Sequence, residues 1–383
     1  MNFTPLKNFL DYYLPMLGIP GSDTSVYVGR EEVFRHTAGF DSLSLKTPVR
    51  RDALYNLYSC TKVATCVAAT QLIERGEIVI TDPIYAYFPE YRNLSVRVKN
   101  PDGSTDIADA KKPMLIKHLL TMTSGLDYNL FRPGIQRVKE ATGGRCPTLD
   151  IVRALSEDPL DFEPGERYQY SLSLDVIGGL IELVSGQSLG EYMKENIFEP
   201  LGMKNTFFGF SEERRADMAC QYSFNQELKF AEEIPVEQNN FVFGPEYESG
   251  GAGLISSVDD YVLLADAITH LGVGKNGSRI LSEAGVNLMR KNQLTASQLK
   301  DFRTCAQNMG YGYGFGVRTN MDPEEAGNLA SVGQFGWDGA KLSYFSSDPE
   351  RRVSVFHAEH MGALHSIVQP RLINLVYSCL DYD

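Results

Sequence analysis

The pattern of apolar and polar positions divides this chain into three parts of different character. Near the start, apolar side chains recur on one helical face, at Leu6, Phe9, Leu10, Tyr13, Leu14 and Leu17. Two strand-like segments follow, Ser25–Val28 and Glu32–His36. A third extended segment, Ala53–Tyr58, runs into an apolar, helix-compatible stretch from Cys60 to Arg75. The pattern thus predicts that a strand-like segment delivers Ser59 to the start of a buried helix.

The middle of the chain, roughly residues 85–245, has the pattern of helices and long loops. Helices are predicted at Leu149–Ser156 and Leu174–Ser185, and another ends at His118–Met122. Residues 92–112 are polar and rich in Gly, Asp and Lys, which predicts an exposed excursion. Beyond residue 249 the pattern predicts a helix, three strands and a last helix, at Val258–His270, Tyr313–Arg318, Lys341–Ser346, Arg352–His357 and Gln369–Tyr377.

This order of elements implies an α/β protein of the α+β type, in which both chain ends build one antiparallel sheet. We expect a single catalytic domain over residues 1–383. Its sheet lobe would comprise residues 1–84 and 246–383, and residues 85–245 would form an inserted, mostly helical lobe. By length alone, two separate domains are equally open.

Composition and charge narrow the function classes. The formal net charge of −13 and the lack of a Lys/Arg run disfavour a nucleic-acid partner. No apolar run approaches the length of a membrane span, and the first residues do not resemble a signal peptide. The six cysteines show no CxxC or metal-finger spacing, which indicates free thiols in a reducing compartment. We therefore predict a cytoplasmic protein without a membrane partner.

The leading chemical signal is Ser59-Cys60-Thr61-Lys62, an S-x-x-K pattern. On a helix, positions i and i+3 share a face, so the lysine amine can reach the serine hydroxyl. A serine needs an adjacent base to become a nucleophile, and lysine can be that base only if its surroundings hold it neutral. Ser297-Gln-Leu-Lys300 also fits the pattern, but its polar surroundings indicate an exposed helix face.

Several further segments match, in the same order along the chain, segments of one known protein superfamily. Together they resemble the superfamily of serine β-lactamases, penicillin-binding proteins and their esterase relatives, from about residue 20 to 360. Beyond Ser59 and Lys62, the matching segments are His118–Leu126 (HLLTMTSGL), Phe162–Glu166 (FEPGE), Ile197–Met203 (IFEPLGM), Ser249–Ser256 (SGGAGLIS) and Tyr311–Val317 (YGYGFGV). The resemblance implies a β-lactamase/transpeptidase-like fold and an acyl-enzyme on Ser59.

The resemblance also implies a catalytic tyrosine, for which Tyr170 in the stretch Tyr168-Gln-Tyr170-Ser-Leu172 is the match. The sequence leaves open whether Lys62 or Tyr170 is the base and whether the two groups titrate as a unit. Leu172 replaces the asparagine of the family's Y-x-N motif, so one polar contact to substrate is absent. Tyr91-Arg-Asn93 fits Y-x-N literally but falls in the predicted excursion. The spacing from Tyr170 to Asp175 is closer to the class-C-β-lactamase-like carboxylesterases than to the lactamases.

The family's third element, Lys-Thr-Gly, is replaced here by Trp337-Asp338-Gly339, followed by Ala340. By resemblance, the N–H groups of Ala340 and Ser59 would form an oxyanion hole. Trp337 would substitute an apolar wall for a cation, and Asp338 would repel anionic substrates if it points inward. Both changes favour a neutral ester.

Other residues carry weaker signals. Tyr128 and Tyr247 could line the cleft by analogy of position, because cleft walls are often aromatic. His357, His360 and His365 with Glu359 could suggest a metal, but structural roles are favoured, so we predict neither a metal nor a cofactor. No G-x-S-x-G elbow occurs, which disfavours an ordinary α/β-hydrolase.

Three functions remain open. The favoured one is a carboxylesterase-like serine hydrolase that acts on a small-molecule ester or amide. The second is a β-lactamase or D-amino-acid peptidase, against which the missing lysine, the missing asparagine and the missing signal peptide weigh. The third is a catalytically silent binding protein, against which Ser59, Lys62 and Tyr170 weigh. The oligomeric state does not follow from the sequence.

Overall fold

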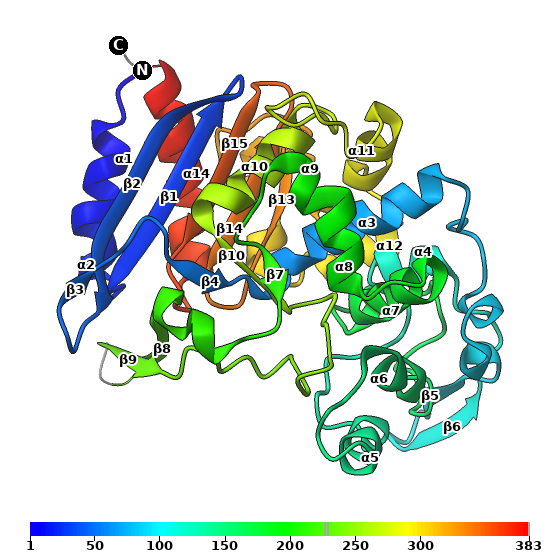
Figure 1. The fold of residues 1–383 in the computed structure, drawn as a ribbon. Coiled ribbons are helices and arrows are strands. Elements are labelled where there is room, and N and C mark those ends of the chain that lie inside the picture. The colour runs from blue at the N-terminus through cyan, green and yellow to red at the C-terminus, as the bar shows by residue number, and fades with distance from the viewer. Residues whose placement is uncertain (226, 228–229, 382–383) are drawn as a thin grey trace.

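The centre of the protein is an eight-stranded antiparallel sheet in a computed structural model that describes residues 1–225, 227 and 230–381 (Figure 1). In spatial order its strands are β11 (Tyr311–Tyr313), β12 (Arg318–Asn320), β13 (Phe335–Asp338), β14 (Ser343–Asp348), β15 (Val353–Ala358), β1 (Gly21–Val28), β2 (Glu31–Ser42) and β3 (Thr47–Pro48). Strands β1 and β15 pair from Asp23 opposite Ala358 to Val28 opposite Val353. The two ends of the chain therefore meet inside one sheet, which confirms the predicted fold class.

Both faces of the sheet are covered, because successive side chains of a strand point to opposite faces. On one face, Val26 and Val355 pack with the N-terminal helical segment and α14 (His365–Asp381). On the other face, Tyr27 and Phe356 pack with α3 (Thr61–Glu74) and α10 (Val258–Thr269). The N-terminal segment runs as α1 (Thr4–Asn8), a π turn (Phe9–Tyr13) and α2 (Leu14–Met16). The two termini lie together, since the Asn2 N–H donates to the Cys379 carbonyl at 3.0 Å.

The remaining helices lie mainly beside α3, away from β2 and β3 (Figure 1). They are α4 (Ile116–Leu120), α5 (Pro133–Ala141), α6 (Thr148–Ala154), α7 (Ser173–Ser185), α8 (Leu189–Met193), α9 (Glu199–Leu201), α11 (Glu283–Arg290), α12 (Ala296–Phe302) and α13 (Pro323–Ala326). Three small sheets complete the fold: β4 (Leu54–Asn56) with β10 (Leu254–Ser257) and β7 (Phe207–Phe208), β5 (Ser95–Lys99) with β6 (Thr105–Asp109), and β8 (Gln221–Asn225) with β9 (Phe230–Ile234).

Two expectations about local structure were wrong. The apolar run Tyr313–Arg318 is not one strand, because the chain reverses between β11 and β12, where the Gly314 N–H donates to the Val317 carbonyl at 2.8 Å. Gly316 has φ +66°, and a Cβ there would lie 2.6 Å from the Cys66 sulfur, so glycine lets the turn pack directly on α3. Tyr91 is buried rather than exposed, and its phenol donates to the Val152 carbonyl at 2.7 Å.

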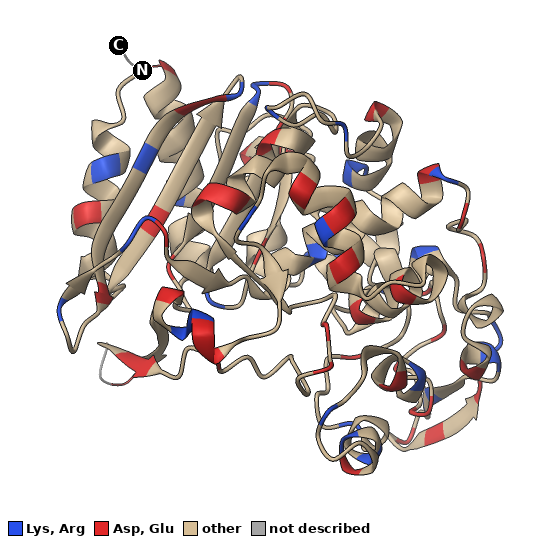
Figure 2. Cartoon of the chain, viewed as in Figure 1, with Lys and Arg blue, Asp and Glu red and all other residues tan. Residues whose placement is uncertain are grey.

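Charged residues are interspersed along the chain, and both signs occur on neighbouring elements (Figure 2). All six cysteines are free thiols, as predicted. Within the described residues, none of the helices combines the length and the apolar character that crossing a membrane requires.

Candidate active site

Ser59 lies on a short turn between a buried strand and a buried helix. Strand β4 pairs with β10, and the chain then enters a 3₁₀ turn, Tyr58–Cys60, that leads into α3. Tyr58 adopts φ +48°, a conformation that side chains other than glycine rarely take. Its phenol donates to the Gln221 side-chain oxygen at 2.5 Å, with the Gln238 carbonyl oxygen 3.1 Å away, and these contacts fix the side chain. Backbone strain of this kind persists only where the surrounding contacts enforce it, and here it presents the Ser59 hydroxyl.

Lys62 lies in the first turn of α3 with its amine beside Ser59. The Nζ atom is 3.2 Å from Ser59 Oγ, 3.3 Å from the Tyr128 phenol oxygen and 2.7 Å from the Gly251 carbonyl oxygen. The side chain is fully buried. Burial lowers the pKa of Lys62 to about 8, although the nearby Asp175 carboxylate opposes that change. A substantial fraction of this amine is therefore neutral near physiological pH.

Asp175 and the loop at residues 249–251 form the wall behind Lys62. The Asp175 carboxylate on α7 accepts hydrogen bonds from the Tyr247 phenol at 2.7 Å, the Ser249 hydroxyl at 2.6 Å and the Gly251 N–H at 3.4 Å. A Cβ at Gly251 would lie 2.5 Å from Asp175 Oδ2 and 3.3 Å from Lys62 Nζ. Glycine therefore lets the loop carbonyl, the carboxylate and the amine approach one another closely.

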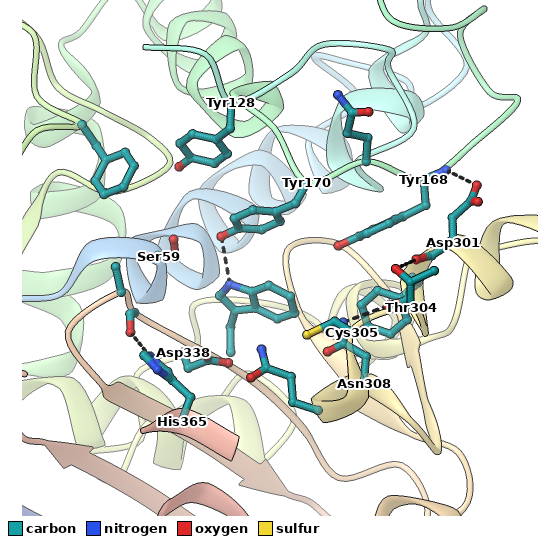
Figure 3. A pocket seen from close by; sticks show the side chains of 17 residues that line it. Ser59, Tyr128, Tyr168, Tyr170, Asp301, Thr304, Cys305, Asn308, Asp338 and His365 are labelled. Carbon is teal, nitrogen blue, oxygen red and sulfur yellow. Dashed lines mark hydrogen bonds and ion pairs between the residues drawn. The ribbon is translucent and has the colours of Figure 1, made fainter. Parts of the chain in front are cut away.

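Two phenols converge on the same point. Tyr170 precedes α7, and Figure 3 shows that Tyr128 and Tyr170 both direct their oxygens toward the side of the pocket where Ser59 lies. The rings of Tyr128 and Tyr170 stack at 5.4 Å, and Lys62 Nζ lies 4.7 Å from the Tyr170 ring centre. Burial raises the pKa of Tyr170, and hydrogen bonds with the Ser59 hydroxyl and the Trp337 indole only partly offset this effect. Burial also raises the pKa of Tyr128.

Trp337 on β13 extends this aromatic stack and also supplies a polar contact. Its ring lies 5.6 Å from that of Tyr170, and its indole N–H donates to the Tyr170 phenol oxygen at 3.1 Å. The sequence led us to expect only an apolar wall. In the structure, Trp337 also orients the phenol that faces Ser59.

Asp338 does not add a free negative charge to the site, contrary to expectation. Its Oδ1 lies 2.7 Å from the buried guanidinium of Arg318 on β12, and its Oδ2 lies 3.8 Å from His365 Nε2. The charge is compensated because β12 and β13 are neighbouring strands that pair Arg318 opposite Gly336.

These residues open onto a pocket of about 640 Å³. Its lining comprises the predicted residues Ser59, Tyr128, Tyr170, Trp337, Asp338, Gly339 and Ala340, and also Tyr168, Gln169, Phe241, Asp301, Phe302, Thr304, Cys305, Gln307, Asn308 and His365. Figure 3 shows Asp301, Thr304, Cys305 and Asn308 gathered on the side away from Ser59. Asp301 is paired with Arg167 at 2.7 Å, and none of the described lining residues is Lys or Arg.

Two residues predicted to contact substrate do not line this pocket. Leu172 is buried in the core at the start of α7, because the chain turns inward after Tyr170 and the Leu172 N–H donates to the Asp127 carbonyl. Tyr247 is buried as well, and its phenol is engaged by Asp175. Both side chains therefore lie outside the pocket lining, where the sequence had suggested a place in the cleft. The second S-x-x-K lies on α12 with Ser297 and Lys300 exposed, as expected.

Sequence reasoning missed the wall at residues 301–308 and the position of His365. Nothing in the local pattern of the 301–308 segment signals a pocket, because long-range packing brings it opposite Ser59. His365 was assigned a structural role, yet it lies beside Ala340 in the lining. His357 and His360 are fully buried, and His357 bonds Thr24 and Glu359.

Comparison with known proteins agrees with this geometry. The sequence model of the Beta-lactamase family matches residues 7–358. The chain belongs to the Beta-lactamase family. Within this family, it is 30% identical over 332 residues to esterase EstB of Burkholderia gladioli, covering 81% of this chain and 78% of the esterase. It is 29% identical to acyltransferase calJ of Penicillium decumbens over 364 residues, covering 90% and 84% of the two chains.

A solved structure shares the fold over nearly the whole length. EstCE1, described as a hydrolase with promiscuous acyltransferase activity, superimposes with a TM-score of 0.78 at 23% identity, covering 99% of this chain and 98% of the other. The family membership and these relatives support hydrolase activity in general terms.

Proposed function

We propose that this protein is a serine hydrolase that cleaves neutral esters through an acyl-enzyme on Ser59. The observation that carries the proposal is the 3.2 Å contact between Ser59 Oγ and the buried amine of Lys62. A serine hydroxyl needs a base within hydrogen-bonding reach, and here that base is one whose pKa of about 8 leaves part of it neutral.

Lys62 is the better candidate for the base, and Tyr170 for a phenol that stays protonated. Burial moves the pKa of Lys62 down toward neutrality and moves that of Tyr170 up. A neutral amine has two N–H donors and one lone pair. Donation to the Gly251 carbonyl and the Tyr128 oxygen would leave the lone pair for the Ser59 proton.

The proposed steps follow from this arrangement. Lys62 takes the hydroxyl proton as Ser59 Oγ bonds to the carbonyl carbon, and the carbonyl electron pair moves onto oxygen. The N–H groups of Ser59 and Ala340 would stabilise this oxyanion. The intermediate collapses, the ester C–O bond breaks, and the proton on Lys62 passes to the leaving alkoxide. Water then gives a proton to Lys62 as its oxygen bonds to the acyl carbon. The acyl–Oγ bond breaks, Lys62 returns the proton to Ser59 Oγ, and the carboxylic acid leaves.

The pocket favours a neutral substrate with a sizeable apolar group. Six Tyr, Phe and Trp side chains line it, and the carboxylates of Asp301 and Asp338 are each paired with an arginine. A penicillin or a peptide would bring a carboxylate, for which the described lining provides no lysine or arginine. Desolvating that charge without a partner would cost binding energy.

The chain offers a matched pair of variants for the test. Ser59→Ala should lower kcat/KM for p-nitrophenyl esters by at least about a thousandfold. Ser297→Ala, in the exposed S-x-x-K on α12, should leave it unchanged. In a mass spectrum of the intact protein, a fluorophosphonate should add the mass of one covalent label to the wild type and none to Ser59→Ala. Undiminished turnover by Ser59→Ala would refute the proposal, and absence of labelling with absence of turnover would favour a binding protein.

Acyl transfer to an alcohol is a second candidate. A pocket of about 640 Å³ has room for an acyl group and an acceptor together. One relative is named an acyltransferase, and the structural neighbour EstCE1 is described as a hydrolase with promiscuous acyltransferase activity. The same acyl-enzyme would then be attacked by an alcohol rather than by water. Addition of butanol during ester turnover tests this: a new butyl ester indicates transfer, and free acid alone indicates hydrolysis.

A further inference from the structure

The carbonyl of Gly339 receives two hydrogen bonds at the edge of the pocket. Gly339 lies in the turn between β13 and β14, and the Leu342 N–H donates to its carbonyl at 2.8 Å. His365 Nε2 approaches the same oxygen at 2.8 Å. A carbonyl can only accept, so Nε2 carries the ring proton and donates it. Both lone pairs of this oxygen are therefore engaged.

This carbonyl belongs to the same peptide unit as the N–H of Ala340. The unit is planar, so fixing the direction of the C=O fixes the direction of the N–H. Hydrogen bonds to the oxygen also polarise the amide and make its N–H a stronger donor. Among the described residues, no acceptor takes a hydrogen bond from the Ala340 N–H. Ala340 lines the pocket together with Ser59, and its N–H is the second oxyanion donor of the proposed mechanism.

Packing holds His365 and the turn together. His365 is the first residue of α14, a 17-residue helix, and its side chain is 18% exposed. Just before it, Gly362 lies against the turn so closely that a Cβ would come within 2.5 Å of the Ala340 carbonyl oxygen. On the other side, a Cβ at Gly339 would come within 2.2 Å of the Leu57 carbonyl, next to the Ser59 turn. The start of α14, which carries His365, thus packs against the Gly339–Ala340 turn, and that turn packs against the segment that leads to Ser59.

We infer that His365 is a positioning residue for the oxyanion site, which it serves by orienting and polarising the Gly339–Ala340 peptide. The inference rests on the proposed function, because it assumes that the Ala340 N–H binds the oxyanion. His365 acts through this peptide, and the reaction needs no proton from the imidazole itself.

The test compares a variant that removes the donor with one that keeps a donor. His365→Ala should lower kcat about tenfold with KM nearly unchanged, which is less than the loss expected from removing an oxyanion donor itself. His365→Gln retains an N–H and should recover much of that loss. Ser366→Ala, at the next and exposed position of α14, should have no effect.

A second readout separates positioning from folding. A trifluoromethyl ketone forms a tetrahedral oxyanion adduct with the serine, so its affinity for His365→Ala should fall by the same factor as kcat, while binding of the uncharged product alcohol stays constant. Unchanged kcat in His365→Ala would overturn the inference, as would a loss that His365→Gln does not rescue and the ketone affinity does not follow. If Ser59→Ala stayed active, the proposed function would fail first and this inference with it.

Discussion

The rate at which Ser59 is acylated should follow the loss of a proton from Lys62. Burial lowers the pKa of this amine from 10.5 to about 8. Only the neutral amine accepts the serine proton, so kcat/KM should rise with pH and level off above the pKa. About one tenth of the amine is neutral at pH 7 and about nine tenths at pH 9, which predicts roughly a tenfold increase between these values.

The assay is kcat/KM for p-nitrophenyl butyrate from pH 6.5 to 9.5, because this ratio reports ionisations of the free enzyme. The rate measured with Ser59→Ala provides the background at each pH. A second part of the experiment uses Asp175, because its carboxylate is the main charge that raises the pKa of Lys62. Asp175→Asn removes this charge, and the inflection should move to lower pH. A urea melt of the variant controls for the lost contacts to Tyr247 and Ser249.

Two results would refute this reasoning. A profile that is flat from pH 6.5 to 9 would mean that Lys62 does not titrate in this range or is not the base. An inflection that stays in place in Asp175→Asn, with the fold intact, would mean that another group titrates.

Three further changes probe the same site. Lys62→Met should abolish turnover yet raise the free energy of unfolding below pH 8 by up to about 3 kcal/mol, because the protonated amine is buried at a cost. This gain in stability should vanish as the pH rises from 8 to 10.5, where Lys62 is neutral in the folded wild type. Urea melts of both proteins at pH 7 and pH 10 measure the difference in the free energy of unfolding. A gain that does not change with pH would contradict the prediction. Arg318→Met should destabilise the fold by about 3 kcal/mol, since it leaves the Asp338 carboxylate, whose side chain is only 10% exposed, without its arginine. In a thermal melt the double variant with Asp338→Asn should lose less than the sum of the single losses, and simple additivity would argue against the pairing. Alkylation of the exposed Cys305 with a bulky maleimide should slow hydrolysis of a decanoate ester several-fold more than hydrolysis of an acetate ester. The same treatment should not affect the activity of Cys305→Ser. Equal slowing of both esters would place the thiol away from the acyl group.

Much of the fold could be predicted because its elements carry local signals. The apolar helix behind Ser59, the strands at 25–28 and 352–357 and the last helix all lie where the pattern placed them. The prediction failed at Tyr313–Arg318, where an apolar run with two glycines has the pattern of a strand. What decides the conformation there is the close approach of Gly316 to Cys66 on α3, a contact between residues distant in sequence.

In the candidate site too, the sequence could predict which residues are present but not how their surroundings change their chemistry. Motifs identified Ser59, Lys62 and Tyr170, but a motif could not say which partner is the base, because the difference lies in their surroundings. Burial lowers the pKa of an amine and raises that of a phenol. The same burial, beneath α7 and the 249–251 loop, therefore shifts the pKa values of Lys62 and Tyr170 in opposite directions. A polar partner at position 172 could not alter this balance directly, since Leu172 points into the core and not into the pocket. The division of labour that we propose between amine and phenol would thus be a property of packing, and variants that open the pocket should change it more than variants that alter the motif around Tyr170.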